Sequence, residues 1–142
     1  MKADRERNAR ALVVLGRADR ELAGWTCPRS AECCQLDRAG REPYLTLAEW
    51  QVIEAEVARQ GRKLPAERED GSCPFLAADQ RCSIYAARPL GCRTYYCEKA
   101  APAGPYPRTA LGALVRDLEA LAPGAERGRT LRSWLREARR RR

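Results

Sequence analysis

Residues 73–97 read CPFLAADQRCSIYAARPLGCRTYYC, and this stretch holds four of the seven cysteines of the chain. They are Cys73, Cys82, Cys92 and Cys97. A shorter stretch upstream, CPRSAECC, supplies the other three, which are Cys27, Cys33 and Cys34. The sequence contains no histidine and no glycine-rich phosphate loop. The chemistry that the sequence predicts is therefore that of sulfur.

The expected compartment determines how these cysteines are interpreted. The charged N-terminal segment MKADRERNAR does not resemble a secretory signal, and no run of about 18 apolar residues predicts a membrane span. We therefore expect a cytoplasmic protein without a membrane segment. In a reducing cytosol, cysteines act more often as metal ligands or redox thiols than as a disulfide framework. Disulfides or inert buried thiols are the alternative, although seven cysteines cannot all pair within one chain.

The net charge of +8 is concentrated at the C-terminus. Residues 127–142 contain eight arginines and one glutamate, whereas the rest of the chain is nearly neutral. An arginine-rich end can attract RNA or another polyanion. Trp134 is the one aromatic residue among these arginines, and the pattern places it on an apolar helix face. We favour a solubilising role for this end over nucleic-acid binding.

Apolar residues at helical spacing predict helices on both sides of the cysteines. A capping box, Thr46-x-x-Glu49, begins the clearest of them. On the first helix the predicted buried face is Leu12, Leu15, Ala18 and Leu22. The expected helices cover residues 4–23 and 47–60, a segment from Thr109 to Pro123, and a segment capped by Thr130.

The cysteine stretch itself is expected to be rich in loops. Residues 73–76 and 82–85 are short and apolar, and they predict a small hairpin that presents Cys73 and Cys82 side by side. Residues 86–90 predict one helical turn. The fold class expected is mainly α, with a loop-rich, metal-organised cysteine centre and at most a small two-stranded β ribbon. A length of 142 residues favours one domain, with a cysteine-cluster core at about 25–98, a helical C-terminal extension at 108–138 and a basic tail at 139–142.

Thiolates bind zinc, copper(I) and iron–sulfur clusters well, and bind magnesium or calcium poorly. Without histidine, an all-protein site must be four cysteines, or cysteines with aspartate or glutamate. The long intervals between Cys73, Cys82 and Cys92 do not fit a zinc ribbon or a thioredoxin-type motif. They remain compatible with a centre that loops gather. Gly91 would allow the backbone to approach a sulfur closely.

Two arginines, Arg88 and Arg93, lie between candidate ligands. They could hydrogen-bond an anionic cluster or bind an anionic substrate, which would make them cofactor-binding residues. They could equally form salt bridges with Glu49 or Asp70. The sequence leaves both alternatives open.

The order of motifs is similar to that of the CxxCxxCC family of zinc- or iron-chelating domains, also called YkgJ-like cysteine-cluster proteins. The similarity spans about Cys27 to Cys97 and includes C-P-F-L and C-x-I-Y-x-x-R-P-x-x-C-R-x-Y. It implies a bound zinc or iron ion, or an iron–sulfur cluster. This chain departs from the family pattern in its first stretch, where Ser30 lies in the region of a family cysteine. The matching residues are Cys33, Cys34, Leu45, Thr46, Glu49, Cys73, Pro74, Phe75, Leu76, Cys82, Ile84, Tyr85, Arg88, Pro89, Cys92, Arg93, Tyr95 and Cys97.

Three functions follow as hypotheses. The first is a metal-binding cysteine-cluster protein in a structural, carrier or electron-transfer role, without catalysis of its own. The second is a redox or radical-type enzyme, or an accessory subunit of one, that uses an iron–sulfur centre. The third is a nucleic-acid-associated protein in which the metal only holds the fold. Each of the three hypotheses is compatible with a protein partner.

Overall fold

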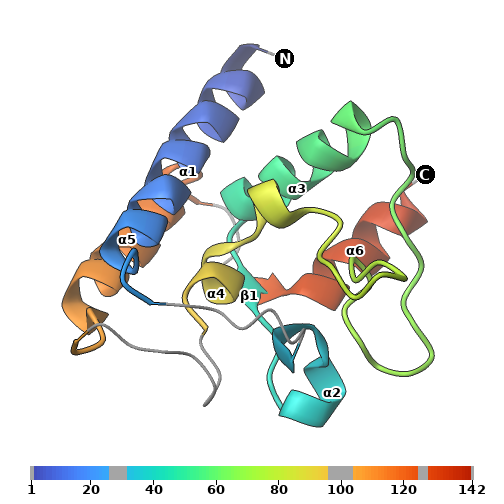
Figure 1. Ribbon diagram of the computed structural model, residues 1–142. Helices are drawn as coiled ribbons and strands as arrows, with labels where there is room; N and C mark the ends of the chain where they lie inside the picture. The colour runs from blue at the N-terminus through green and yellow to red at the C-terminus, as the bar shows by residue number, and fades with distance from the viewer. Residues whose placement is uncertain (1, 26–31, 96–103, 125–127, 142) are drawn as a thin grey trace.

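The computed structural model describes residues 2–25, 32–95, 104–124 and 128–141. Figure 1 shows α1 (Lys2–Glu21) and α5 (Arg108–Ala120) packed side by side. Helix α3 (Leu47–Arg59) packs against both of them, and α6 (Leu131–Arg140) lies on the side of α3 away from α1. The short helix α4 (Leu90–Arg93) also contacts α1. Two further short helices, η1 (Glu32–Cys34) and α2 (Leu36–Ala39), form a separate turn, and η2 (Tyr85–Ala87) precedes α4. The prediction of a mainly α fold is confirmed.

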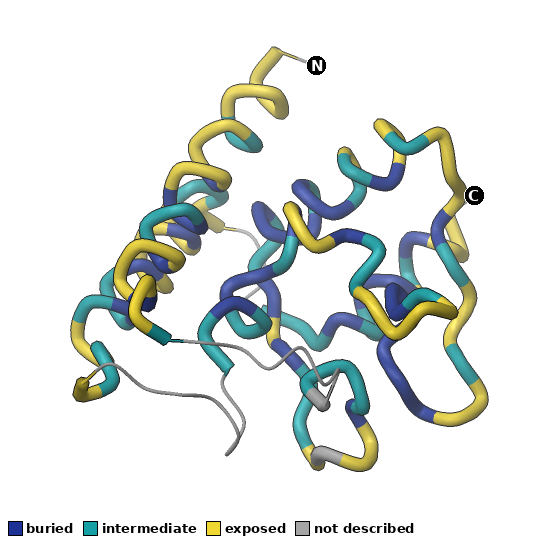
Figure 2. The backbone as a smooth tube through the Cα atoms, viewed as in Figure 1, coloured by how far each residue is buried: buried dark blue, intermediate teal, exposed yellow. Residues whose placement is uncertain are grey.

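Helix α1 and the turn that follows it bury one stripe of small and aliphatic side chains, which are Ala11, Val14, Leu15, Ala18 and Leu22. The prediction was wrong at Leu12, whose side chain is 45% exposed. Ala11 rather than Leu12 precedes Leu15 on the stripe that faces α3 and α5. The first turns of α1 extend beyond its neighbours and are exposed (Figure 2). None of the helices in the described segments is long and apolar enough to span a bilayer.

Helix α3 begins as its sequence predicts. The backbone N–H of Glu49 donates to the Thr46 hydroxyl over 3.3 Å, and the Thr46 N–H donates to the Glu49 carboxylate over 2.7 Å. This reciprocal pair is a complete capping box, which satisfies two donors that a helix start leaves unpaired. Glu49 also reaches beyond its own helix, because its Oε1 accepts from the Leu90 N–H at 2.8 Å. The cap therefore connects α3 to the start of α4.

The two-stranded sheet pairs β1 (Tyr44–Leu45) with β2 (Arg129–Thr130) in antiparallel register. The predicted ribbon between residues 73–76 and 82–85 was wrong in its extent. Those residues form a tight antiparallel turn with a single bridge between Leu76 and Cys82. This turn joins neighbouring segments, whereas β1 and β2 pair two parts of the chain that are distant in sequence.

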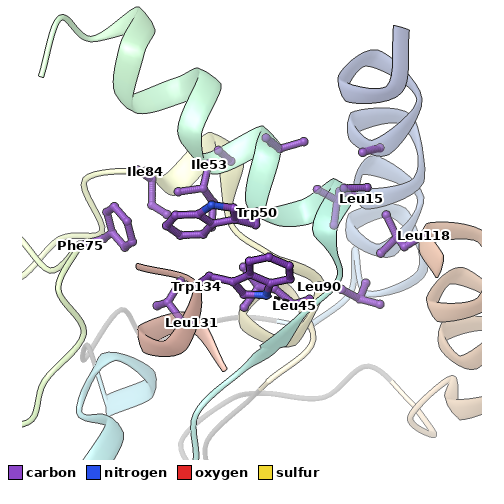
Figure 3. Close-up of a cluster of buried hydrophobic side chains, with 14 of the residues drawn as sticks. Leu15, Leu45, Trp50, Ile53, Phe75, Ile84, Leu90, Leu118, Leu131 and Trp134 are labelled. Atoms are coloured by element: carbon purple, nitrogen blue, oxygen red, sulfur yellow. Dashed lines mark hydrogen bonds between the residues drawn. The ribbon is translucent and has the colours of Figure 1, made fainter. Parts of the chain in front are cut away.

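The core is organised around two stacked indole rings. Trp50 of α3 and Trp134 of α6 lie 6.4 Å apart between ring centroids and are nearly parallel (Figure 3). The Trp134 Nε1–H donates to the Leu45 carbonyl over 2.9 Å. Phe75 and Ile84, from the turn between Cys73 and Cys82, lie beside Trp50. The cysteine stretch is therefore anchored in the same core that the C-terminal helix completes.

Candidate metal centre

The structure describes five of the seven cysteines, all as free thiols, on three separate stretches of chain. Cys33 and Cys34 lie on η1, and Cys92 lies in α4. Cys73 begins the antiparallel turn, and Cys82 lies within it, opposite Leu76. Each stretch has a buried apolar anchor nearby. The anchors are Leu36, Phe75, Leu76, Ile84 and Leu90. Cys27 and Cys97, which were predicted as ligands, lie outside the described residues.

The first cysteine stretch is joined to the second by backbone hydrogen bonds. The Cys73 N–H donates to the Cys34 carbonyl over 2.6 Å, and the Asp37 N–H donates to the Gly71 carbonyl over 3.2 Å. Gly71 has a φ of +75°, and a Cβ at this position would lie 2.0 Å from a carboxylate oxygen of Asp37. Only glycine lets the two segments come this close.

The turn that carries Cys73 and Cys82 is fastened to α3. The Ser83 N–H and hydroxyl both donate to the Phe75 carbonyl, over 2.8 and 2.7 Å. The Gln60 side chain donates to the Ser83 carbonyl over 2.9 Å. These bonds attach the turn that carries both cysteines to the core of the protein.

In place of the single helical turn predicted for residues 86–90 there are two short helices, and Cys92 lies in the second of them. Residues 85–87 form η2, and α4 begins only at Leu90, whose buried side chain and N–H are both held by the core. The expectation for Gly91 was wrong. A Cβ there would lie 3.0 Å from Pro43, so the missing side chain makes room for the chain before β1 rather than for a sulfur.

The thiols of these stretches influence one another. Hydrogen bonding with the Cys34 side chain, together with burial, raises the pKa of Cys33 far above its ordinary value. The Cys33 side chain lowers the pKa of Cys34, but hydrogen bonding with Cys73 and burial outweigh this and raise that pKa to about 12. Burial raises the pKa of Cys82. Burial also raises the pKa of Cys92, and the charges of Cys82, Cys33 and Cys34 raise it further. Cysteines of all three stretches therefore lie close enough to affect the pKa values of one another.

Arg88 is a cation whose charge acts on these thiols. Its charge opposes the rise in the pKa of Cys33, Cys82 and Cys92. The guanidinium lies 3.8 Å from the centroid of the Tyr85 ring, and its Nε donates to the Tyr85 carbonyl over 3.0 Å. Arg88 is thus held in place beside the thiols, and direct contact with a cofactor stays a prediction.

Arg93 is buried and has three bonds of its own within the protein. It donates to the carbonyls of Arg88 and Ala86, each over 2.7 Å, and to the Asp19 carboxylate over 2.6 Å. Its ion-pair partner is therefore on α1, not Glu49 or Asp70 as the sequence suggested. Arg93 fastens the 86–88 segment to both α4 and α1. Its assignment as a cofactor-binding residue stays a prediction.

The donor set suits a thiophilic metal in its chemistry, because every described candidate ligand is a sulfur. The thiols are gathered but do not yet surround one point. Within the described ranges, no three cysteine, aspartate or glutamate side chains already stand in a geometry that could hold a metal ion. Sequence reasoning missed the Cys34–Cys73 contact and the Asp19 partner, and neither has a local signal in the sequence.

The arginines of α6 bind the body of the protein. Arg132 donates to the Glu42 carboxylate over 3.0 Å, and Arg136 makes a two-bond contact with Glu67. Arg139 donates to the Leu64 carbonyl over 2.9 Å. These side chains stabilise the docking of the C-terminal helix, and nucleic-acid binding by this end stays a prediction.

No curated protein and no solved structure matches the chain. A family model, CxxCxxCC, described as "Putative zinc- or iron-chelating domain", matches residues 26–109. The match covers more than half of the chain and includes every cysteine from Cys27 to Cys97. It also takes in α3 and α4, whose capping contact positions Cys92. By this match, and by the gathering of its thiols, the chain belongs to the CxxCxxCC family of zinc- or iron-chelating domains.

Proposed function

We propose that the protein binds zinc, iron or an iron–sulfur cluster in one thiolate centre, with a structural, carrier or electron-transfer role. The ligands are drawn from Cys33, Cys34, Cys73, Cys82 and Cys92, together with Cys27 and Cys97. The observation that carries the proposal is that the fold brings cysteines from separate stretches of chain together, with the Cys73 N–H donating to the Cys34 carbonyl over 2.6 Å. This contact joins two of the three stretches and favours one centre over two separate sites.

The raised pKa values explain why a cation is needed. Without one, burial and like charge keep these thiols protonated at neutral pH. A bound metal ion reverses this preference, because it stabilises thiolates by direct coordination. Metal uptake should therefore release protons. Arg88, held on Tyr85, would offset part of the negative charge that several thiolates bring to one ion.

A structural contribution follows from how the cysteine stretches are held. The described cysteines lie in short helical turns and in a single-bridge turn, not in the longer helices of the fold. A metal shared by these stretches would cross-link segments that are distant in sequence. Because such a site forms only in the folded chain, its binding energy stabilises the fold.

The test begins with anaerobic purification, followed by metal and acid-labile sulfide analysis. Stoichiometric zinc in a colourless protein supports the structural or carrier role. Iron with sulfide, and visible absorption that dithionite bleaches, supports electron transfer or redox chemistry. Cys92→Ser should lose the metal, whereas the matched control Ser30→Ala should keep it. Protein that contains no metal after anaerobic purification, or Cys92→Ser that retains it, refutes the proposal.

Metal content also distinguishes one centre from two. With one centre, Cys34→Ser and Cys92→Ser each remove the same metal equivalents, and the double variant removes no more. With two centres, each single variant removes only part of the metal and the losses add. Additive losses would contradict the proposed single centre while leaving metal binding itself intact.

A further inference from the structure

Two of the thiols are held by a contact that no metal is needed to make. The Cys73 N–H donates to the Cys34 carbonyl over 2.6 Å. Among the backbone hydrogen bonds of the described residues outside regular helices and strands, this one joins two cysteines directly. It links η1 to the start of the antiparallel turn, across a large gap in sequence.

This contact limits the distance between the two residues. Standard bond lengths place the two Cα atoms no farther apart than about 6.5 Å when the nitrogen and oxygen are 2.6 Å apart. Disulfides bridge Cα atoms separated by about 4.4–6.8 Å. The backbone therefore need not move far for Cys34 and Cys73 to bond.

The other described pairs are less well placed. Cys33 and Cys34 are neighbours on η1, and a disulfide between adjacent residues closes a small, strained ring. The Cys82 segment pairs with Leu76, and the Cys92 N–H donates to the Pro89 carbonyl, so neither of these backbones is held against another described cysteine.

The two thiols also differ in access. Cys34 is partly exposed, whereas Cys73 is 7% exposed and packs with the core. An oxidant in solution meets Cys34 first, and Cys73 lies behind it. Cys34 is thus the more accessible thiol of the pair, and Cys73 is the buried one.

We propose that Cys34 and Cys73 are a redox-sensitive pair that closes to a disulfide when a peroxide oxidises the protein. The Cys34 sulfur attacks one peroxide oxygen, the O–O bond breaks, and a sulfenic acid and water form. The Cys73 sulfur then attacks the Cys34 sulfur, the S–OH bond breaks, and the hydroxyl leaves as water with the Cys73 proton. Two thiols are oxidised, and one peroxide is reduced to two waters.

This inference rests on the proposed function for one consequence only. If Cys34 and Cys73 are ligands of the centre, the disulfide withdraws two sulfurs at once and the metal is released. The disulfide itself requires only the contact between the two stretches. Bond formation and metal release can therefore be measured separately.

Reduced, metal-free protein is treated with hydrogen peroxide, digested without reduction and examined by mass spectrometry. The expected product is lighter by two hydrogens and contains a linked pair of peptides with Cys34 and Cys73. Cys73→Ser should instead accumulate a Cys34 sulfenic acid, which a 1,3-diketone traps. The matched variant Cys82→Ser should give the same linked peptides as the unmodified sequence.

Zinc-loaded protein is then oxidised in the same way while a colorimetric chelator reports free zinc. Zinc release that follows disulfide formation supports the inference that the disulfide withdraws ligands from the metal. A different pairing as the main product, or sulfinic acids without a linked pair, overturns the proposal even if the variants fail to fold. If the Cys34–Cys73 disulfide forms without zinc release, the claim of metal release is wrong and the claim of disulfide formation stands. Protein that never binds zinc, iron or a cluster counts against the proposed function instead.

Discussion

Replacing Arg93 with methionine tests whether this arginine stabilises the fold or binds a cofactor. Methionine keeps much of the apolar stem and removes the guanidinium with its three bonds, to the Arg88 carbonyl, the Ala86 carbonyl and Asp19. Hydrogen bonds from a charged donor contribute about 1.5–3 kcal/mol each. We take the lower figure for the two carbonyl bonds, because Ala86 is exposed and water can replace the lost donor there.

The Asp19 pair adds little to this sum. Its carboxylate is 48% exposed, and pairs with that much solvent contribute about 0–1 kcal/mol. Removing the buried guanidinium also relieves some desolvation, which is the main cause that lowers the pKa of Arg93. We therefore expect Arg93→Met to lower the free energy of unfolding by about 2–3 kcal/mol, and to lower the Tm by roughly 10 °C.

The assay is thermal unfolding, followed by circular dichroism, of metal-free and metal-loaded protein in parallel. A structural role predicts a similar loss of Tm in both forms. Asp19→Asn is the control, and it should cost at most about 1 kcal/mol. Arg93→Lys should not restore stability, since one ammonium cannot reach all three acceptors. A loss confined to the metal-loaded protein would refute the structural assignment and favour cofactor contact.

Three further changes test the packing. Gly71→Ala should destabilise the protein by about 1–3 kcal/mol in denaturant titration, because φ is positive and a carboxylate blocks the added Cβ; Gly61→Ala, with equally positive φ but open space, should cost less. Trp134→Phe should cost about 0.5–1.5 kcal/mol more than Trp50→Phe, since the Trp134 N–H donates to the Leu45 carbonyl and the Trp50 N–H has no partner among the described residues; equal costs would contradict this. Burial raises the pKa of Glu49 above 4.5, so the folded state binds its proton more tightly than the unfolded state, and stability relative to Glu49→Gln should rise as pH falls from 7 towards 4.5. Urea titrations of both proteins across that range check this, and a difference that falls instead would show that the hydrogen bonds to the carboxylate outweigh its burial.

Features that depend on neighbouring residues could be predicted from the sequence. The capping box at Thr46 and Glu49 is one, because both partners lie within one helical turn and their chemistry requires no other part of the chain. The cap at Thr130 is another, and its hydroxyl accepts from the Ser133 N–H. The helical fold class followed from apolar spacing alone.

Features that depend on distant partners could not be predicted in the same way. The strand at Tyr44–Leu45 pairs with Arg129–Thr130, and two residues of strand carry no periodic signal. The partner of Arg93 is on α1, and many carboxylates in this charged sequence could have served equally well. The Cys34–Cys73 contact likewise depends on Gly71 allowing η1 to approach. For the metal centre, the residue type of the ligands could be predicted from the sequence, whereas which cysteines lie together depends on the fold.

The stacking of Trp134 on Trp50 has a consequence for the order of events during synthesis. The cysteine stretches and the core residues that anchor them precede α6 in the chain, so they leave the ribosome first. Until α6 follows, Trp50 lacks its stacking partner and β1 lacks β2. Because the centre forms only in the folded chain, we expect the thiols to acquire their metal after α6 has closed the core. Loading of the centre would then follow translation rather than accompany it.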